Sequence, residues 1–290
     1  MQVIARSVLE IHDKQSRHSV RASEKLVARR AEFSALNGSD GEIKALRVSA
    51  THDEIVQAIT EFVSRANGNI VLDITSFPKR FSFPMVRRLL ADANRSRVSN
   101  LIATYSIPIT YPNGPLAENF NDWAQLPLFS GQYAAPPSSM LIIGVGFQAL
   151  GLQEQLKGEP ELPIKLLLPF PAPPAAFQRS WELLRQLKKN RNQDAFEVFR
   201  ASATDAVDTF ERIVKATDGG RMRADLAPFG PKPMSLGMCI FAALTDAQVF
   251  YTQPSVYHPD YSIGVSRNDG EPEVFAYALR INGRDIFGLP

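Results

Sequence analysis

Several classes of protein are excluded by what the sequence lacks. A single cysteine, Cys239, stands among 290 residues, so the chain cannot form an intrachain disulfide or a zinc site built from several thiolates. The longest apolar run, 140–147, is far shorter than the roughly 20 residues of a membrane-spanning helix. The first residues lack the apolar stretch of a signal peptide. We therefore expect a soluble protein of the reducing cytoplasm.

Common catalytic and cofactor motifs are also missing. The sequence has no Walker A, H-E-x-x-H or G-x-S-x-G pattern. The stretch Gly144-Val-Gly-Phe-Gln-Ala149 matches G-x-G-x-x-A, but the next predicted strand ends without the carboxylate that would hold a ribose. We interpret its glycines as a tight strand-to-helix corner. The sequence thus names no cofactor and no metal site, and its formal charge of +2 predicts no bulk attraction to nucleic acid or membrane.

What the sequence does contain is a regular alternation of short apolar runs and amphipathic segments. The predicted strands are 45–50, 69–74, 100–107, 140–144, 164–168, 195–201, 223–227, 248–252 and 273–281, and the predicted helices are 55–66, 84–94, 148–156, 177–189, 204–216 and 234–244. Thr51 and Glu54 form a capping box before the first of these helices. Such alternation predicts an α/β fold of mainly parallel sheets flanked by helices.

The predicted organisation has four parts. Residues 1–41 form a basic N-terminal helical segment, and residues 42–111 form a first Rossmann-like lobe. Residues 112–139 are a connector rich in proline and aromatic residues, which we expect to cross between the lobes or to cover the site. Residues 140–290 form a second Rossmann-like lobe that ends in an edge strand.

An internal repeat underlies this organisation. Asp73-Ile-Thr-Ser-Phe-Pro-Lys-Arg-Phe-Ser-Phe-Pro-Met85 reads as a strand end, a Pro-Lys turn and a helix that begins at Pro84. The stretch 225–238 has the same layout, with Lys232 aligned to Lys79 at a spacing of 153 residues. Each helix precedes a strand that ends in a Tyr-x-x-Pro-x-x-Tyr phrase, at 105–111 and 251–257. We interpret the two stretches as a diverged duplication.

The repeated turns are the predicted ligand site. Ligands of open α/β sheets bind beyond the carboxyl ends of the strands, and a helix N-terminus beside a lysine favours an anion. The predicted ligand-binding residues are Thr75, Ser76, Lys79, Arg80, Lys232, Tyr105, Tyr251, Gln253 and Tyr257. The alternative is structural: the prolines, Met85 and Met238 shape the corner while the lysines point to water.

This layout resembles that of tandem CARF-type sensor domains, in which two Rossmann-like units meet over a cyclic nucleotide. The resemblance implies a sensor that binds a phosphorylated or nucleotide-like ligand between pseudo-equivalent lobes. That is the function we expect first.

Two other functions stay open. On the same scaffold, His258, Asp73 and Asp225 could serve as the acid–base groups of a hydrolase or transferase acting on a nucleotide or nucleic acid, although each aspartate could instead cap its turn. Alternatively the chain is a subunit of a larger assembly. In that case one face of the N-terminal helix would contact a protein or nucleic acid, through the cations Lys14, Arg17, Arg21, Lys25 and Arg29. The same stripe also suits a solvated face.

Overall fold

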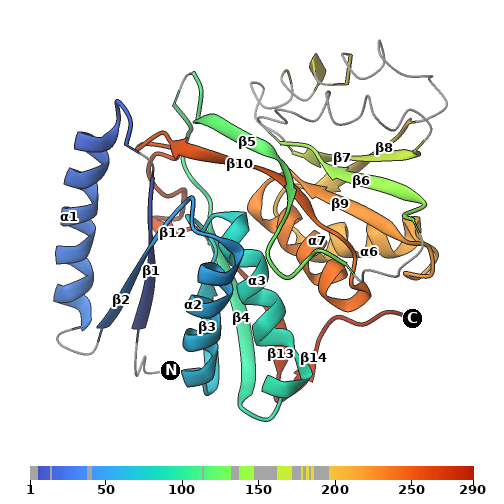
Figure 1. Cartoon of the computed structure of the whole chain (residues 1–290), viewed down its shortest axis with the longest axis horizontal. Coiled ribbons are helices and arrows are strands. Elements are labelled where there is room, and N and C mark those ends of the chain that lie inside the picture. The colour runs from blue at the N-terminus through green and yellow to red at the C-terminus, as the bar shows by residue number, and fades with distance from the viewer. Residues whose placement is uncertain are drawn as a thin grey trace.

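The chain folds as a mixed α/β protein, as the alternation predicted (Figure 1). The computed structural model describes residues 6–13, 15–37, 41–112, 114–131, 137–146, 162–171 and 196–290, together with 178, 181–182 and 184–185. The helices predicted at 148–156 and 177–189 lie wholly or largely outside the described residues.

The N-terminal unit differs from the predicted helical segment. Strand β1 (Arg6–His12) precedes helix α1 (Ser19–Asn37), and β2 (Gly41–Arg47) then pairs with β1 in parallel. The pairing runs from Arg6 opposite Gly41 to His12 opposite Arg47. Residues 6–12 are therefore extended because a partner strand is available, which local helix propensity does not reveal.

The first half carries a four-stranded sheet in the order β14-β13-β4-β3. Its elements are α2 (His52–Arg65), β3 (Gly68–Asp73), α3 (Lys79–Leu90), the short η1 (Asp92–Asn94), β4 (Val98–Ser106), β13 (Val274–Ile281) and β14 (Arg284–Asp285). Strands β3 and β4 are parallel, whereas β13 runs antiparallel to β4. The tail strand, expected at the edge of the second lobe, thus belongs to the sheet of the first half.

The second half carries a parallel sheet in the order β8-β7-β6-β9. Its elements are β6 (Met140–Gly144), β7 (Ile164–Phe170), β8 (Phe196–Ser202), α6 (Ala206–Ala216), β9 (Ala224–Pro228) and α7 (Lys232–Thr245). Every residue of β6 is buried, as befits a central parallel strand covered on both faces.

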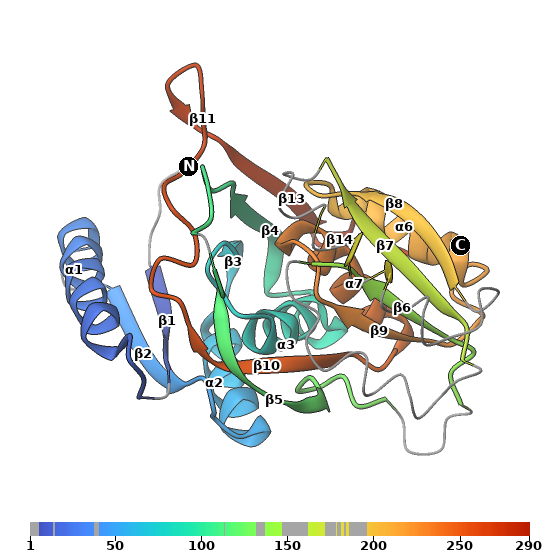
Figure 2. The ribbon, with the colours of Figure 1, turned by 90° about the horizontal axis from the view of Figure 1, so that it is seen from above.

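A long antiparallel ribbon joins the two halves. It consists of β5 (Ala117–Gln125), which lies in the predicted connector, and β10 (Phe250–Tyr257). Val249 forms an isolated parallel bridge with Leu226 of β9, so the ribbon continues the second-half sheet. In Figure 1 the ribbon runs from the end near α1 across to β9, and Figure 2 shows it passing beside α2 and α3. The hairpin of β11 (Arg267–Asn268) and β12 (Glu271–Pro272) projects from the molecule in Figure 2.

Helix α3 begins earlier than predicted. Pro78 is its N-cap residue and Lys79 its first residue, so Pro84 lies inside the helix instead of opening it. Pro84 has no N–H, which leaves the Arg80 carbonyl without its helical partner. Burial outweighs this loss, because Phe81, Val86 and Leu89 are fully buried in the core that α3 shares with α7.

Candidate functional site

The two repeated turns meet, and their lysines cross over. Lys79 Nζ donates to the carbonyl oxygens of Pro228 at 2.5 Å and Gly230 at 2.8 Å, in the turn before α7. Lys232 Nζ donates to the carbonyl of Phe77, in the turn before α3. We call this reciprocal arrangement of Lys79, Lys232 and the three carbonyls the lysine clasp. It joins the halves at the point where sequence analysis placed the ligand.

Lys79 is buried and Lys232 is half-buried, and among the described residues no carboxylate forms an ion pair with either amine. Burial lowers the pKa of Lys79 well below its usual value, and the neighbouring charge of Lys232 lowers it further. Burial also lowers the pKa of Lys232, to about 7, while Asp73 acts in the opposite direction. The Lys79 ammonium lies 5.4 Å from the ring centre of Tyr251, a cation–π contact. Because these lysines are bound to backbone carbonyls, the geometry favours a structural role for them.

A small cavity lies between α3 and α7 beside the clasp. Its volume is about 10 Å³, which is room for about one water molecule and far too little for a nucleotide. Its lining includes four pairs of residues that the repeat makes equivalent: Lys79 and Lys232, Ser82 and Ser235, Phe83 and Leu236, and Val86 and Cys239. The cavity therefore lies between equivalent faces of the two helices.

The hydroxyl and carboxylate groups of the turns mainly bind the backbone. Asp73 Oδ1 accepts from the Thr75 N–H at 2.8 Å, and Thr75 Oγ1 accepts from the Ser106 N–H at 2.9 Å. Ser76 is exposed. Asp225 Oδ1 accepts from the Ser138 hydroxyl at 2.6 Å. Asp73 thus caps its turn, which was one of the two roles the sequence allowed.

Arg80 differs from the two lysines. Its guanidinium donates to the carbonyls of Val48 at 3.1 Å and Ala50 at 2.6 Å, and the side chain is half-buried. Within the part of the chain that the structure describes, no carboxylate forms an ion pair with it. Burial lowers its pKa, and the Tyr257 hydroxyl lies close enough to oppose this effect. Arg80 is therefore a partly desolvated cation with N–H groups to spare.

His52, the first residue of α2, lies near Arg80. Burial lowers the pKa of His52, and the charge of Arg80 lowers it further. His52 is nevertheless exposed at the surface, so it lies at the rim of the Arg80 environment.

Five tyrosines lie near one another, and one of them, Tyr257, lies near Arg80. This tyrosine cluster consists of Tyr105, Tyr111, Tyr251, Tyr257 and Tyr261. Burial raises the pKa of each of them, and their hydroxyls influence one another. The Tyr257 and Tyr261 rings meet edge to face at 5.9 Å. Both Tyr-x-x-Pro-x-x-Tyr phrases contribute, so the tertiary structure brings the two halves of the repeat together here.

The buried side chain of Gln253 forms hydrogen bonds to Tyr257 of this cluster and to the backbone beside it. Its Nε2 donates to the Tyr257 hydroxyl at 2.9 Å and to the Pro254 carbonyl at 2.7 Å. A carbonyl only accepts, so the amide orientation is settled and the Tyr257 proton remains available for another acceptor. Gln253 is 5% exposed, and its Oε1 has no hydrogen-bond partner among the described residues.

The acid–base residues expected for an enzyme are engaged separately. His258 Nδ1 accepts from the Asp260 N–H at 3.1 Å, and its ring meets that of His18 at 5.1 Å. Asp73 and Asp225 have the turn contacts described above. Over the described ranges, no three His, Cys, Asp or Glu side chains come together as a metal site.

The basic stripe of α1 faces the rest of the protein. Arg17 pairs with Glu118 of β5, and both Arg21, at 2.5 Å, and Lys25 pair with Asp260 after β10. Arg29 pairs with Glu32 on the same helix at 2.5 Å. Lys14 lies outside the described residues. These three cations thus join α1 and the segment before it to β5 and to the loop that follows β10.

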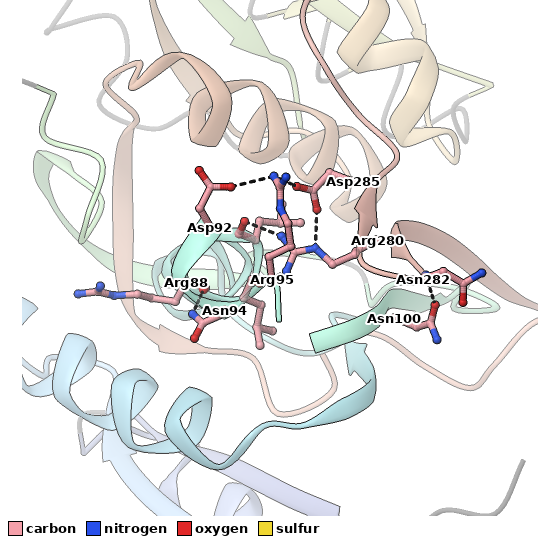
Figure 3. Close-up of polar contacts among 10 residues, drawn as sticks. Arg88, Asp92, Asn94, Arg95, Asn100, Arg280, Asn282 and Asp285 are labelled. Atoms are coloured by element: carbon pink, nitrogen blue, oxygen red, sulfur yellow. Dashed lines mark hydrogen bonds and ion pairs between the residues drawn. The ribbon is translucent and has the colours of Figure 1, made fainter. Parts of the chain in front are cut away.

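The far end of α3 is held by a buried arginine (Figure 3). Arg280 of β13 is fully buried, and its guanidinium donates to the carbonyls of Leu89 at 3.2 Å and Leu90 at 2.7 Å. Its Nε pairs with Asp285 at 2.5 Å, and Arg95 reaches the same carboxylate at 2.8 Å. These bonds satisfy carbonyls that a helix C-terminus leaves open, so α3 is anchored at both ends.

Comparison with known proteins adds no family. No protein-family model matches the chain, and no curated protein matches it. Among the described residues, no helix is both long and apolar enough to cross a membrane.

Proposed function

We propose that the protein binds a phosphorylated or nucleotide-like ligand where Arg80 and the tyrosine cluster meet, between two Rossmann-like halves. The observation that carries the proposal is the half-buried guanidinium of Arg80, which has no carboxylate partner among the described residues. Desolvating a cation is costly unless an opposite charge meets it. A ligand phosphate would supply that charge.

The surroundings of Arg80 suit a phosphate. A guanidinium presents a planar fork that matches phosphate oxygens, and two backbone carbonyls hold this one in place. Helix α3 has no acidic residue in its first turn and no side-chain cap, so its N-terminal N–H groups and positive dipole are not neutralised locally. Thr75 and Ser76 lie in the turn that leads into this helix.

The tyrosine cluster suits the rest of a nucleotide-like ligand. Tyrosine rings stack on planar groups and their hydroxyls donate hydrogen bonds. Tyr257 keeps its proton for an acceptor because Gln253 donates to its oxygen. Tyr105 comes from the first half, and Tyr251 and Tyr257 come from the second. A ligand here would contact both halves, which is what a sensor of the CARF-like layout requires.

In this proposal the clasp lysines act indirectly. Lys79 and Lys232 hold the turns before α3 and α7 together, and Lys79 also contacts the Tyr251 ring. In the second-half sheet the strand order turns between β6 and β9, which is where α/β sheets usually bind ligands. The β9 turn at that place supplies the carbonyls that Lys79 binds.

The two other functions receive less support from the geometry. His258, Asp73 and Asp225 have separate partners, so no contact assembles them as a catalytic set. The basic stripe of α1 is largely paired within the chain. We therefore advance neither the enzyme nor the assembly subunit.

Thermal unfolding with candidate ligands tests the proposal. Nucleotides, cyclic nucleotides and inorganic phosphate would each be added to the wild type, to Arg80→Lys and to Arg65→Lys. A ligand at 100 times its Kd stabilises the native state by about 2.7 kcal/mol. Arg80→Lys keeps the charge but loses the fork, so it should weaken binding by about tenfold or more. Arg65 lies on exposed α2 surface and serves as the matched control.

The outcomes separate clearly. A melting shift that Arg80→Lys reduces and Arg65→Lys preserves supports the site. Equal shifts in all three proteins would place the ligand elsewhere. A wild type that no compound stabilises would count against a phosphorylated or nucleotide-like ligand altogether.

A further inference from the structure

We propose that a second copy of this chain docks on the open face of the β14-β13-β4-β3 sheet and forms a weak, twofold-symmetric dimer. The open face is the side of this sheet that carries the side chains of Val71, Ile102, Thr104, Val274, Ala276 and Ala278. This surface lies outside the Arg80 site, so the proposal does not depend on the proposed function.

Alternating burial along the strands shows that one side of this sheet is open. Leu72, Leu101 and Leu279 are at most 8% exposed and belong to the core that contains residues of α2 and α3. The side chains between them point the other way, as the two-residue period of a strand requires: Val71 is 51% exposed and Val274 is 52% exposed. Parallel strands such as β3 and β4 normally lie in sheets that are covered on both faces. This side is therefore of the kind that usually packs against a partner.

The composition of the open face is that of an interface. The strand register places Val71, Ile102 and Ala278 side by side in one row, and the next row contains Thr104 beside Ala276. A sheet face that meets water usually carries polar side chains, whereas the first of these rows is wholly apolar. Contiguous exposed apolar side chains mark interaction sites, and charged residues are depleted at the centre of such sites.

Two ionisable side chains of opposite charge lie on the open face among the described residues of the four strands. They are Asp73 on β3 and Arg284 on β14, and both are exposed. Arg284 is opposite Ile281 of β13, on the other side of the sheet from Arg280, whose guanidinium contacts α3. No ion pair involves Asp73 or Arg284 within the part of the chain that the structure describes. Each charge is thus available to a partner.

The two charges lie at diagonally opposite corners of the face. Asp73 lies beside Thr104 of β4, whereas Arg284 lies on the far edge strand, level with Asn100 of β4. With strands about 4.8 Å apart and residues about 3.3 Å apart, the corners are separated by about 14 Å across the strands and about 13 Å along them. The face is therefore nearly square.

A nearly square face with opposite charges at two corners is complementary to itself. A second copy turned about a twofold axis along the other diagonal places each Asp73 opposite the partner's Arg284. The apolar rows of the two copies then cross at the centre, with the strands at about 90°, which is one of the usual packing angles of two sheets. This charge complementarity favours a second copy of the chain as the occupant.

The size of the face predicts a reversible dimer. Four strands with about 20 Å of strand length present a planar area of about 300 Å². Stable interfaces bury about 800 Å² per partner, and smaller ones belong to transient complexes. We therefore expect a dissociation constant in the micromolar range.

Sedimentation velocity of the whole chain tests the apolar part of the contact. Between about 1 and about 200 µM the wild type should pass from monomer to dimer. Val71→Lys buries an unpaired charge in the contact, so it should raise the dissociation constant about tenfold or more. Val207→Lys, at an exposed position of α6, is the matched control and should leave the constant unchanged. Circular dichroism shows whether each variant is folded.

Charge reversal tests the twofold arrangement. Arg284→Glu and Asp73→Lys should each weaken self-association about tenfold, because the contact occurs twice in the dimer and becomes repulsive. An equimolar mixture of the two variants should dimerise like the wild type, because the two reversed charges then face each other and the unchanged Asp73 and Arg284 do so as well. Lys215→Glu, at an exposed position of α6, should have no effect.

Three results would overturn the proposal. One is a wild type that stays monomeric at about 200 µM. Another is a dimer that neither Val71→Lys nor Arg284→Glu weakens, which would place the contact on a different surface. The third is a mixture of Arg284→Glu and Asp73→Lys that associates no better than either variant alone, because the twofold contact requires that rescue.

Discussion

Lys232 shows how one residue can make stability depend on pH. Its side chain crosses from α7 to the Phe77 carbonyl and ends in a desolvated place, so its pKa falls from the usual 10.5 to about 7. Between these values the unfolded chain holds a proton that the folded chain has released. The free energy of unfolding therefore rises with pH across this interval and gains nothing below it.

We predict that Lys232→Met flattens this dependence. In the wild type, the free energy of unfolding should increase between pH 7 and 9.5 by up to about 1.4 kcal/mol per pH unit for each such lysine. Lys232→Met should reduce the slope, and Lys79 supplies what remains. The measurement is urea unfolding. Staying below pH 9.5 keeps the tyrosines protonated, and exposed Lys215→Met is the control.

Gly146 is a second residue whose role comes from its neighbours. A Cβ atom placed there would lie 1.8 Å from the Phe229 carbonyl oxygen, in the turn before α7. The obstacle is backbone, so it cannot rotate away. This supports reading the Gly144-x-Gly146 motif as a close corner.

We predict that Gly146→Ala lowers the free energy of unfolding by about 3 kcal/mol. Gly288→Ala is the matched control, because a Cβ there meets no atom within 4 Å and its backbone conformation is not restricted to glycine. Urea unfolding of both variants decides the matter. Equal stabilities would show that the Gly146 backbone has room to move.

At the scale of elements, α3 is organised by contacts at both ends. Its first residue, Lys79, binds the turn before α7, and its last carbonyls bind Arg280 of β13 (Figure 3). Arg280 lies 190 or more positions along the chain from every residue of α3, so no local pattern reveals this cap. The helix that carries Arg80 is thereby fixed by strands from both ends of the fold.

We predict that Arg280→Met destabilises the protein by about 3 kcal/mol or more. Removing the guanidinium leaves the Leu89 and Leu90 carbonyls and the Asp285 carboxylate without their buried partner. Arg95→Met is the control, because Arg95 pairs with Asp285 near the surface, where such pairs contribute about 1 kcal/mol or less. Thermal and urea unfolding should rank the variants in that order; the reverse order would contradict the anchoring role of Arg280.

At the scale of the whole molecule, the two halves are interleaved. Strand β13, near the C-terminus, completes the sheet of β3 and β4, and β5 from the connector pairs with β10 of the second half. One apolar core contains residues of α3 and α7 together, including Phe81, Met85, Ile240 and Phe241. The sheet of the first half is therefore incomplete without β13, and β10 is unpaired without β5.

This interleaving predicts a single cooperative unfolding transition. Far-ultraviolet circular dichroism reports the helices of both halves, and Trp123 in the β5–β10 ribbon reports their junction by fluorescence. With Trp181→Phe, Trp123 is the sole tryptophan. The urea midpoints from the two probes should coincide. Two separated midpoints would mean that the halves unfold independently.

Local signals explain which parts of the fold and site were predictable. Thr51 and Glu54 form the expected capping box, and Asn282 and Gly283 adopt positive φ in the expected turn. Residues of this kind act on their immediate neighbours. The prediction that α3 begins at Pro84 was wrong, because the burial of the helix outweighs the preference of proline for a helix start. The prediction of a helix over residues 6–12 was wrong, because their partner strand β2 follows only after helix α1 and local sequence does not reveal that pairing.

The sequence by itself determined the mixed α/β class, the repeated Pro-Lys turns and the Tyr-x-x-Pro-x-x-Tyr stretches. Each of these features depends on residues that are close together along the chain. Only the tertiary structure decided what these residues do. It turned the two lysines toward each other's backbone, left Arg80 half-buried without a carboxylate partner among the described residues, and placed β13 beside β4. The physical reason is that desolvation and strand pairing depend on which distant segments come into contact, and the spacing of residues along the chain does not predict those contacts.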